Sequence, residues 1–254
     1  MDASLYRTTI IRLIDKFIKR NGRKGPFSKS SRHGHGDHPR LGDFMPPVRL
    51  NRRMWAGGRL HFSSPLRLGR PATRHSEITS IRFKQGRSGK LAFVCVRHDY
   101  SQGGSVSFSE EHDIVYKAPL EEPANQPLPS PPLPAPRTPA ATRHIVPDPV
   151  LLFRYSALTF NGHRIHYDRR YCLEEEGYPG LVVHGPLIAT LLVELLGSEY
   201  PDRPLKLFQF KALSPLFDGE KFTVNCSAIE DGKVSLWAAD KDGGLCMEAE
   251  AELG

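Results

Sequence analysis

The alternation of apolar and polar side chains divides the chain into four stretches, two of which are rich in predicted strands. Residues 48–118 contain short alternating runs separated by glycine-containing turns at 85–89 and 102–104. This spacing predicts the strands of an antiparallel meander. Residues 90–100 carry apolar side chains at odd and even positions alike, which predicts a strand buried on both faces.

The second strand-rich stretch, residues 150–254, contains an apolar segment at 187–196 that predicts a helix. Pro186 suits its first turn, and Gly197 suits its end. Residues 151–160 fit a strand or a loop. Turns at Asp231-Gly232 and Asp242-Gly243 are expected among strands at 205–210, 221–229, 233–239 and 245–253. A buried helix followed by a sheet that wraps it is an α+β arrangement.

The two strand-rich stretches are separated by residues 119–149, which hold 11 of the 22 prolines. Proline lacks a backbone donor and fixes φ, so this composition predicts an extended, semi-rigid linker. A ligand for proline-binding modules is the alternative. The chain therefore divides into a basic segment at 1–39, a first half at 40–118, the linker, and a second half at 150–254.

The basic segment begins with an amphipathic pattern. Residues 4–20 place aliphatic and aromatic side chains near one helical face, with Arg12 and Lys16 on the opposite one. This helix either docks on the folded body or serves as a mitochondrial presequence. Asp2 and Asp15 count against the presequence, because such segments are poor in acidic residues.

The net charge of +7 is concentrated in the same region. Residues 1–53 hold 13 basic and 4 acidic side chains, which gives +9 and leaves −2 for the remainder. A nucleic-acid-binding domain more typically spreads lysine and arginine over its folded surface. No nucleic-acid partner is therefore expected. A solvated tail is the simplest interpretation of the segment, with non-specific anion binding and targeting as alternatives.

Composition excludes several classes of protein. Hydrophobic residues make up 39% of the chain, which excludes global disorder. No window approaches the roughly 18 apolar residues of a membrane span. The four cysteines form no CxxC pair, which favours a reducing compartment, the cytoplasm, with the mitochondrion as the alternative. No metal site is expected, since the cluster His33, His35 and His38 has no cysteine or acid at ligand spacing.

The chemically informative segment is Tyr155-Ser-Ala-Leu-Thr-Phe-Asn161-Gly-His163-Arg-Ile-His166. It resembles the hydratase motif of the MaoC-like hotdog family, in which an acidic residue precedes a histidine by five positions. In this sequence His166 matches the histidine, and Asn161 stands where the family has its acid. His163 falls at the family's asparagine, and Arg164 at its proline.

The resemblance extends to most of the chain. Residues 153–168 and 180–186 resemble the branch that contains mesaconyl-C4-CoA and itaconyl-CoA hydratases and the type 2 hydroxyacyl-thioester dehydratases. Residues 52–59 and 110–116 resemble the non-catalytic first half of that branch. The resemblance implies a double hotdog, two central helices each wrapped by an antiparallel sheet, in which only the second half carries the motif. Residues 4–20 are the available source of the first central helix.

Hydration of an enoyl thioester requires a base that activates water and donors that hold the developing enolate oxygen. His166 titrates near neutral pH and can carry the proton, while Asn161 orients the water through its amide because it cannot act as a carboxylate base. Backbone N–H groups at the helix start, where Gly185 permits close approach, can polarise the thioester carbonyl. Asn161 and His166 are thus the catalytic candidates. The substrate-binding candidates are His163, Arg164, His184 and Gly185.

Each of these residues also has a structural interpretation. His166 can be a hydrogen-bonded core histidine, and Asn161 can form a turn with the following glycine. His163 fits a supporting role better than a direct one, and His184 fits a helix-entry position. Arg154 or Arg164 could pair with a distal substrate carboxylate.

The sequence therefore predicts a hydro-lyase that reversibly adds water to a 2-enoyl-CoA thioester of the mesaconyl-C4-CoA or itaconyl-CoA type. CoA or ACP is the substrate carrier, and neither a metal nor a redox cofactor is expected. A homodimer is the predicted assembly. Two alternatives remain open. One is a mitochondrial (R)-3-hydroxyacyl-ACP dehydratase of fatty-acid synthesis, and the other is a catalytically inactive acyl-thioester-binding protein.

Overall fold

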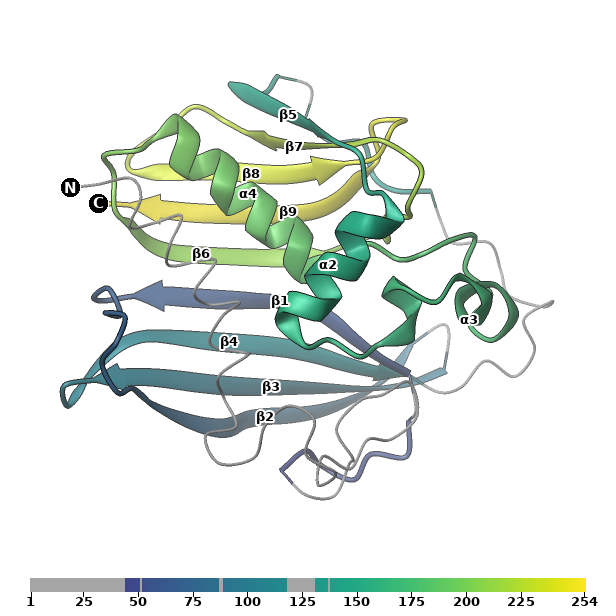
Figure 1. Cartoon of the computed structure of the whole chain (residues 1–254), viewed down its shortest axis with the longest axis horizontal. Coiled ribbons are helices and arrows are strands. Elements are labelled where there is room, and N and C mark those ends of the chain that lie inside the picture. Colours follow the sequence, from purple (N-terminus) through teal and green to yellow (C-terminus); the bar gives the residue numbers. More distant parts are fainter. Residues whose placement is uncertain (1–43, 51, 87–88, 118–130, 137) are drawn as a thin grey trace.

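The computed structural model describes residues 44–254 apart from 51, 87–88, 118–130 and 137. The predicted helix at 4–20 lies outside these residues, as does the first part of the predicted linker. The described part of the chain forms one antiparallel sheet of nine strands in the order β2-β3-β4-β1-β6-β9-β8-β7-β5 (Figure 1). None of its helices is both long and apolar enough to cross a membrane.

The first half of the sheet is antiparallel, as predicted, but only three of its four described strands form a meander, because β1 pairs with β4 and not with β2. Its strands are β1 (Arg52–Phe62), β2 (Thr73–Gly86), β3 (Gly89–Gln102) and β4 (Ser105–Lys117). The prediction that β3 is buried on both faces is wrong. Ala92, Val94 and Val96 are buried, whereas Phe93 and Cys95 on the other face are only partly covered. This alternation is typical of an antiparallel sheet with one covered and one solvated face.

The second half contains the remaining strands and all the described helices. The strands are β5 (Ala141–Ile145), β6 (Leu205–Ala212), β7 (Phe222–Cys226), β8 (Lys233–Ala239) and β9 (Leu245–Leu253). The helices are α2 (Pro149–Thr159), the 3-10 turn η3 (Arg164–His166), α3 (Arg169–Glu174) and α4 (Gly185–Glu199). Helix α4 packs against β5, β7 and β8, and the predicted central helix of this half is therefore in place (Figure 1).

Residues 151–160 form helix α2 rather than a strand or a loop. The Asp148 carboxylate accepts a hydrogen bond from the Leu151 backbone N–H at 2.7 Å, and Pro149 occupies the first turn. Both features favour a helix start. The helix ends at Phe160, whose φ of 50° is left-handed. A short apolar run does not distinguish a strand from a helix, and the start signal lay inside the predicted linker.

Two predicted boundaries are also wrong. The predicted linker at 119–149 contains β5, which pairs with β7 from Ala141–Cys226 to Ile145–Phe222 and so belongs to the second half. Helix α4 continues past Gly197 to Glu199. A helical glycine costs only about 1 kcal/mol relative to alanine, and the neighbouring Leu195 and Leu196 are buried. Tertiary packing therefore carries the helix through Gly197.

The two halves are continuous because β1 pairs with β6 from Gly57–Lys211 to His61–Leu207. This contact requires glycine on β1. A Cβ on Gly57 would collide with the carbonyl oxygen of Phe210, and one on Gly58 would lie 2.7 Å from the carbonyl oxygen of Glu111. Hydrogen bonding between β1 and β6 therefore fixes the position of the first half of the sheet relative to the second half, which carries the helices.

Candidate active site

Three of the predicted histidines lie together where η3 meets the start of α4. The rings of His166 and His184 stack with centroids 3.7 Å apart and an interplanar angle of 16°. The ring of His163 stands perpendicular to that of His166, at 5.5 Å. A hydrogen bond of 2.9 Å from the Val182 backbone N–H to the Ile165 carbonyl ties the two segments together.

The hydrogen bonding of His166 determines its tautomer. Its Nδ1 lies 2.7 Å from the carbonyl oxygen of Val182. A carbonyl oxygen only accepts, so Nδ1 carries the hydrogen and Nε2 of the neutral ring keeps a lone pair. Burial lowers the pKa of His166 to about 4, although the bond to Val182 acts in the opposite direction. At neutral pH His166 is therefore an unprotonated base.

His184 is fully buried at the entrance to α4. Its Nε2 lies 2.8 Å from the hydroxyl oxygen of Ser156, and the ring of Tyr155 packs against it at 4.8 Å. Burial, followed by the charges of His166 and His163, lowers the pKa of His184 to about 2. His184 is thus a neutral ring that supports His166. The sequence analysis did not single out Ser156 as a site residue. The one sequence feature that points to it is its position inside the motif segment.

Asn161 shapes the turn between α2 and η3. Its Oδ1 accepts the His163 backbone N–H at 3.1 Å, and its own backbone N–H donates to the Ser156 carbonyl at 2.9 Å. The turn interpretation of Asn161 therefore has direct geometric support. The side-chain NH₂ makes no hydrogen bond within the part of the chain that the structure describes, which leaves it able to donate to a ligand or water.

Arg164 does not join the histidine group. Its guanidinium binds the Asp168 carboxylate through Nε at 3.0 Å and through Nη2 at 2.7 Å. The same group lies over the Tyr171 ring, 4.3 Å from the centroid. These contacts engage Arg164 at the start of α3, on the surface.

Gly185 is the first residue of α4, directly after His184, and Pro186 follows it in the first turn. A Cβ on Gly185 would have the Met247 methyl group as its nearest neighbour, at 4.0 Å. No described side chain caps this helix end by a hydrogen bond. The first amides of a helix lack intrahelical partners and attract negative charge, so this end can receive a developing oxyanion.

Comparison with known proteins places this geometry in a family. A model of the hydroxyacyl-thioester dehydratase type 2 family matches residues 21–218. Mesaconyl-C(4)-CoA hydratase of Chloroflexus aurantiacus is 48% identical over 232 residues, which cover 91% of this chain and 80% of that protein. The chain belongs to the type 2 hydroxyacyl-thioester dehydratase family.

Membership in this family makes the chain a hydro-lyase of the hydratase and dehydratase type. The mitochondrial hydroxyacyl-thioester dehydratase type 2 of Schizosaccharomyces pombe is a more distant member, 27% identical over 77% of this chain and 71% of its own. The MaoC-like resemblance seen in the motif is thus confirmed.

Solved structures confirm the hotdog fold. A MaoC-like dehydratase from Phytophthora capsici superposes with a TM-score of 0.68 at 15% identity, covering 96% of this chain and 81% of its own. A Mycobacterium tuberculosis protein described as a double hotdog gives a TM-score of 0.51 at 14% identity, covering 81% and 76%. The predicted double hotdog is therefore correct, and α4 is the central helix that the described residues contain.

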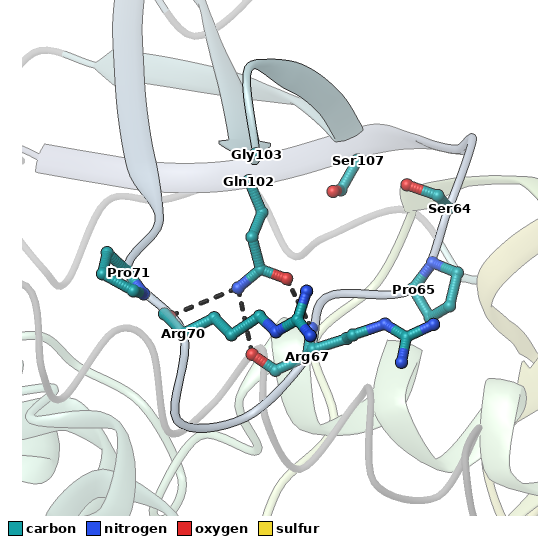
Figure 2. Close-up of a pocket in the computed structure, with 8 residues that line it drawn as sticks. All are labelled: Ser64, Pro65, Arg67, Arg70, Pro71, Gln102, Gly103 and Ser107. Carbon is teal, nitrogen blue, oxygen red and sulfur yellow. Dashed lines mark hydrogen bonds between the residues drawn. The ribbon is translucent and has the colours of Figure 1, made fainter.

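A pocket at the β3–β4 hairpin lies apart from this site. The Gln102 side chain fixes its rim, because its amide donates to the carbonyl oxygens of Arg67 at 3.0 Å and Arg70 at 3.2 Å (Figure 2). Its Oε1 accepts the Arg67 backbone N–H at 2.8 Å. The pocket contains none of the six predicted site residues. It is lined by Ser64, Pro65, Arg67, Arg70, Pro71, Gln102, Gly103 and Ser107.

Within the described residues, no group of three or more histidine, cysteine, aspartate or glutamate side chains is placed to hold a metal ion. The described site offers acid–base chemistry at His166 and hydrogen bonding at the start of α4.

Proposed function

We propose that the protein reversibly adds water to a 2-enoyl-CoA thioester, with His166 as the proton carrier. The observation that carries the proposal is the hydrogen bond from His166 Nδ1 to the Val182 carbonyl, which leaves the Nε2 lone pair available in a buried site. A neutral, buried imidazole with a fixed tautomer is suited to general base catalysis.

In the hydration direction, His166 Nε2 accepts a proton from water as the oxygen bonds to C3 of the enoyl group. The electron pair of the C2–C3 double bond moves onto the thioester carbonyl, which becomes an enolate. Backbone N–H donors at the start of α4, beside Gly185, stabilise the enolate oxygen. The imidazolium then returns its proton to C2. Asn161 orients the water through its free NH₂ group.

A short acyl group of the mesaconyl-C4-CoA or itaconyl-CoA type is our proposed substrate. The relative from Chloroflexus aurantiacus, named a mesaconyl-C(4)-CoA hydratase, supports it by its 48% identity. The family model and the mitochondrial yeast relatives favour a second candidate, dehydration of an (R)-3-hydroxyacyl-ACP. The cytoplasmic location and the homodimer stay predictions, which cell fractionation and sedimentation test.

A panel of substrates tests the proposal. We expect purified protein to remove the enoyl-thioester absorbance of mesaconyl-CoA faster than that of crotonyl-CoA, and to act slowly on (R)-3-hydroxybutyryl-ACP. Faster turnover of the ACP substrate would favour the second candidate. Binding of CoA thioesters without any turnover, not restored by Asn161→Asp, would identify an inactive thioester-binding protein.

A further inference from the structure

A buried carboxylate lies beside the segment that leads into α4. The Asp218 side chain is only 2% exposed, and it forms an ion pair with the half-exposed guanidinium of Arg169, the first residue of α3. Arg169 follows His166 by three positions in the chain. A carboxylate buried to this extent is costly to desolvate unless it is paired and hydrogen-bonded, so its partners indicate what it does.

Asp218 holds both backbone groups of Leu181. Its Oδ1 accepts the Leu181 backbone N–H at 2.8 Å, and its own backbone N–H donates to the Leu181 carbonyl at 2.9 Å. Two positions further along, the Val183 backbone N–H donates to the Leu216 carbonyl at 2.8 Å. The residues on either side of Val182 are therefore fixed by the segment that ends at Asp218.

Val182 itself bonds to a different segment, the turn η3. Its N–H donates to the Ile165 carbonyl at 2.9 Å, and its carbonyl accepts the Nδ1–H of His166 at 2.7 Å. Arg169 ties Asp218 to the helix that follows η3, so these contacts form a closed loop. A displacement of the Asp218 carboxylate would therefore move the Val182 carbonyl relative to His166.

The tautomer of His166 depends on the position of that carbonyl. A neutral imidazole carries its hydrogen on either ring nitrogen, and the hydrogen bond made by one nitrogen decides which. With Nδ1 bonded to Val182, Nε2 keeps the lone pair that accepts a proton from water in the proposed reaction. If the carbonyl moved away, part of the population would carry the hydrogen on Nε2 and could not act as the base.

Gly180 shows how closely the carboxylate is packed. A Cβ at this position would lie 2.7 Å from Asp218 Oδ1 and 3.6 Å from Arg169 Nη1. The carboxylate is buried and bonded to two partners, so it has to shift to admit a methyl group. Gly180→Ala is therefore a way to displace Asp218 without removing a charge.

We propose that Asp218 is a positioning residue for the hydration reaction: paired with Arg169, it fixes the Val182 carbonyl and thereby keeps His166 in the Nδ1–H tautomer. The inference rests on the proposed function, since the tautomer matters for turnover only if His166 Nε2 is the base. A packing role alone would leave the tautomer unchanged when the carboxylate is removed or displaced.

NMR of protein with ¹⁵N-labelled histidines tests the inference without any turnover. Protonated and unprotonated ring nitrogens have well-separated shifts, and the signals that disappear in His166→Gln are those of His166. In the wild type at pH 7 we expect Nδ1 to be protonated and Nε2 to be unprotonated. In Asp218→Ala and in Gly180→Ala both signals should move toward intermediate shifts, because the two tautomers then exchange.

The matched control is Asp99→Ala, in the first half of the sheet. Asp99 also forms an ion pair with a partly exposed arginine, Arg97, and its carboxylate accepts a hydrogen bond from the Ser109 hydroxyl at 2.6 Å. This variant should leave the His166 signals and the rate of hydration unchanged.

Hydration kinetics give a second readout. Asp218→Ala should lower kcat about 10- to 100-fold and change KM less than about threefold, because a misplaced base affects the chemical step more than binding. Gly180→Ala should act in the same direction. This split between kcat and KM distinguishes a positioning role from a general loss of folded protein.

His166 signals identical to those of the wild type in folded Asp218→Ala and Gly180→Ala proteins would overturn the inference, as would a loss of kcat with an unchanged tautomer. A changed tautomer with unchanged kcat would contradict His166 Nε2 as the base, and with it the positioning role. If the wild type hydrates no enoyl thioester, the proposed function fails, and the NMR signals still report separately whether Asp218 fixes the tautomer.

Discussion

His166 and His184 are held as neutral rings by burial, and this property decides how the site responds to pH. The lowered pKa of about 4 for His166 means that its Nε2 stays unprotonated over the whole neutral range. A free histidine would lose its basicity near pH 6.5. We therefore expect kcat/KM for enoyl-thioester hydration to stay level from pH 7 to about 5 and to fall only near pH 4. Stopped-flow assays with brief exposure to each pH measure this, and an acidic limb centred at 6.5 would refute it.

The same pKa shift makes folding stability depend on pH. Between about pH 4 and 6.5 the unfolded chain protonates this histidine while the folded chain does not, so the free energy of unfolding rises with pH in that window. Across this window the free energy of unfolding changes by about 3 kcal/mol for a pKa shift of this size. In urea titrations at pH 4.5 and 7, His166→Gln should reduce the pH dependence. A slope identical to the wild type would show that His166 protonates equally in both states.

The residues of the site show where sequence reasoning succeeded and where it stopped. The sequence predicted a proton carrier in the motif followed by an oxyanion site at the helix start, and the structure brings His163, His166 and His184 together there. Their stacking and the role of Ser156 depend on how α2 and η3 meet the start of α4, which no spacing encodes.

At the scale of elements, α2 positions the site because it carries Tyr155 and Ser156. Its N-terminus is capped by the Asp148 carboxylate, which accepts the Leu151 N–H. Asp148→Ala should lower the free energy of unfolding by about 0.5–2 kcal/mol. Urea denaturation measures the loss, and Asp202→Ala, at an exposed turn position, is the control. Equal stability of the two variants would mean that the cap contributes nothing.

Element boundaries were predicted best where turns are encoded locally. Strand β8 has the predicted bounds, and the turn before it contains Asp231 and Gly232 at φ of 48° and 79°, as a tight hairpin requires. Helix α2 was missed because ten apolar-rich residues fit a strand as well as a helix. Strand β5 was missed because its five residues lie in a proline-rich stretch and carry no strand pattern of their own. They form a strand by pairing with β7.

At the scale of the whole molecule, the pairing of β1 with β6 joins the two halves into one continuous sheet. The sequence predicted the two halves but not this contact, since it depends on the close approach of two strands about 150 residues apart. Gly57→Ala places a methyl group against the Phe210 carbonyl and should destabilise the protein by about 1–3 kcal/mol.

Gly197→Ala is the control for Gly57→Ala, because the same substitution is expected to stabilise the protein at this position. A Cβ at this position in α4 meets no neighbour within 4 Å, and alanine is the better helix former. This variant should raise the free energy of unfolding by about 0.5–1 kcal/mol. Thermal and urea unfolding measure both variants. A neutral Gly57→Ala would contradict the requirement for glycine between the halves.

The central claim is that His166 carries the proton in a hydro-lyase reaction. The most direct measurement is the loss of mesaconyl-CoA absorbance with wild-type protein, His166→Ala and His144→Ala, the last at an exposed histidine of β5. Removal of a general acid–base residue typically costs about 10²–10⁴-fold in rate. We predict a loss of that size for His166→Ala, with CoA-thioester binding retained and His144→Ala fully active. Unchanged turnover in a folded His166→Ala protein would contradict the account.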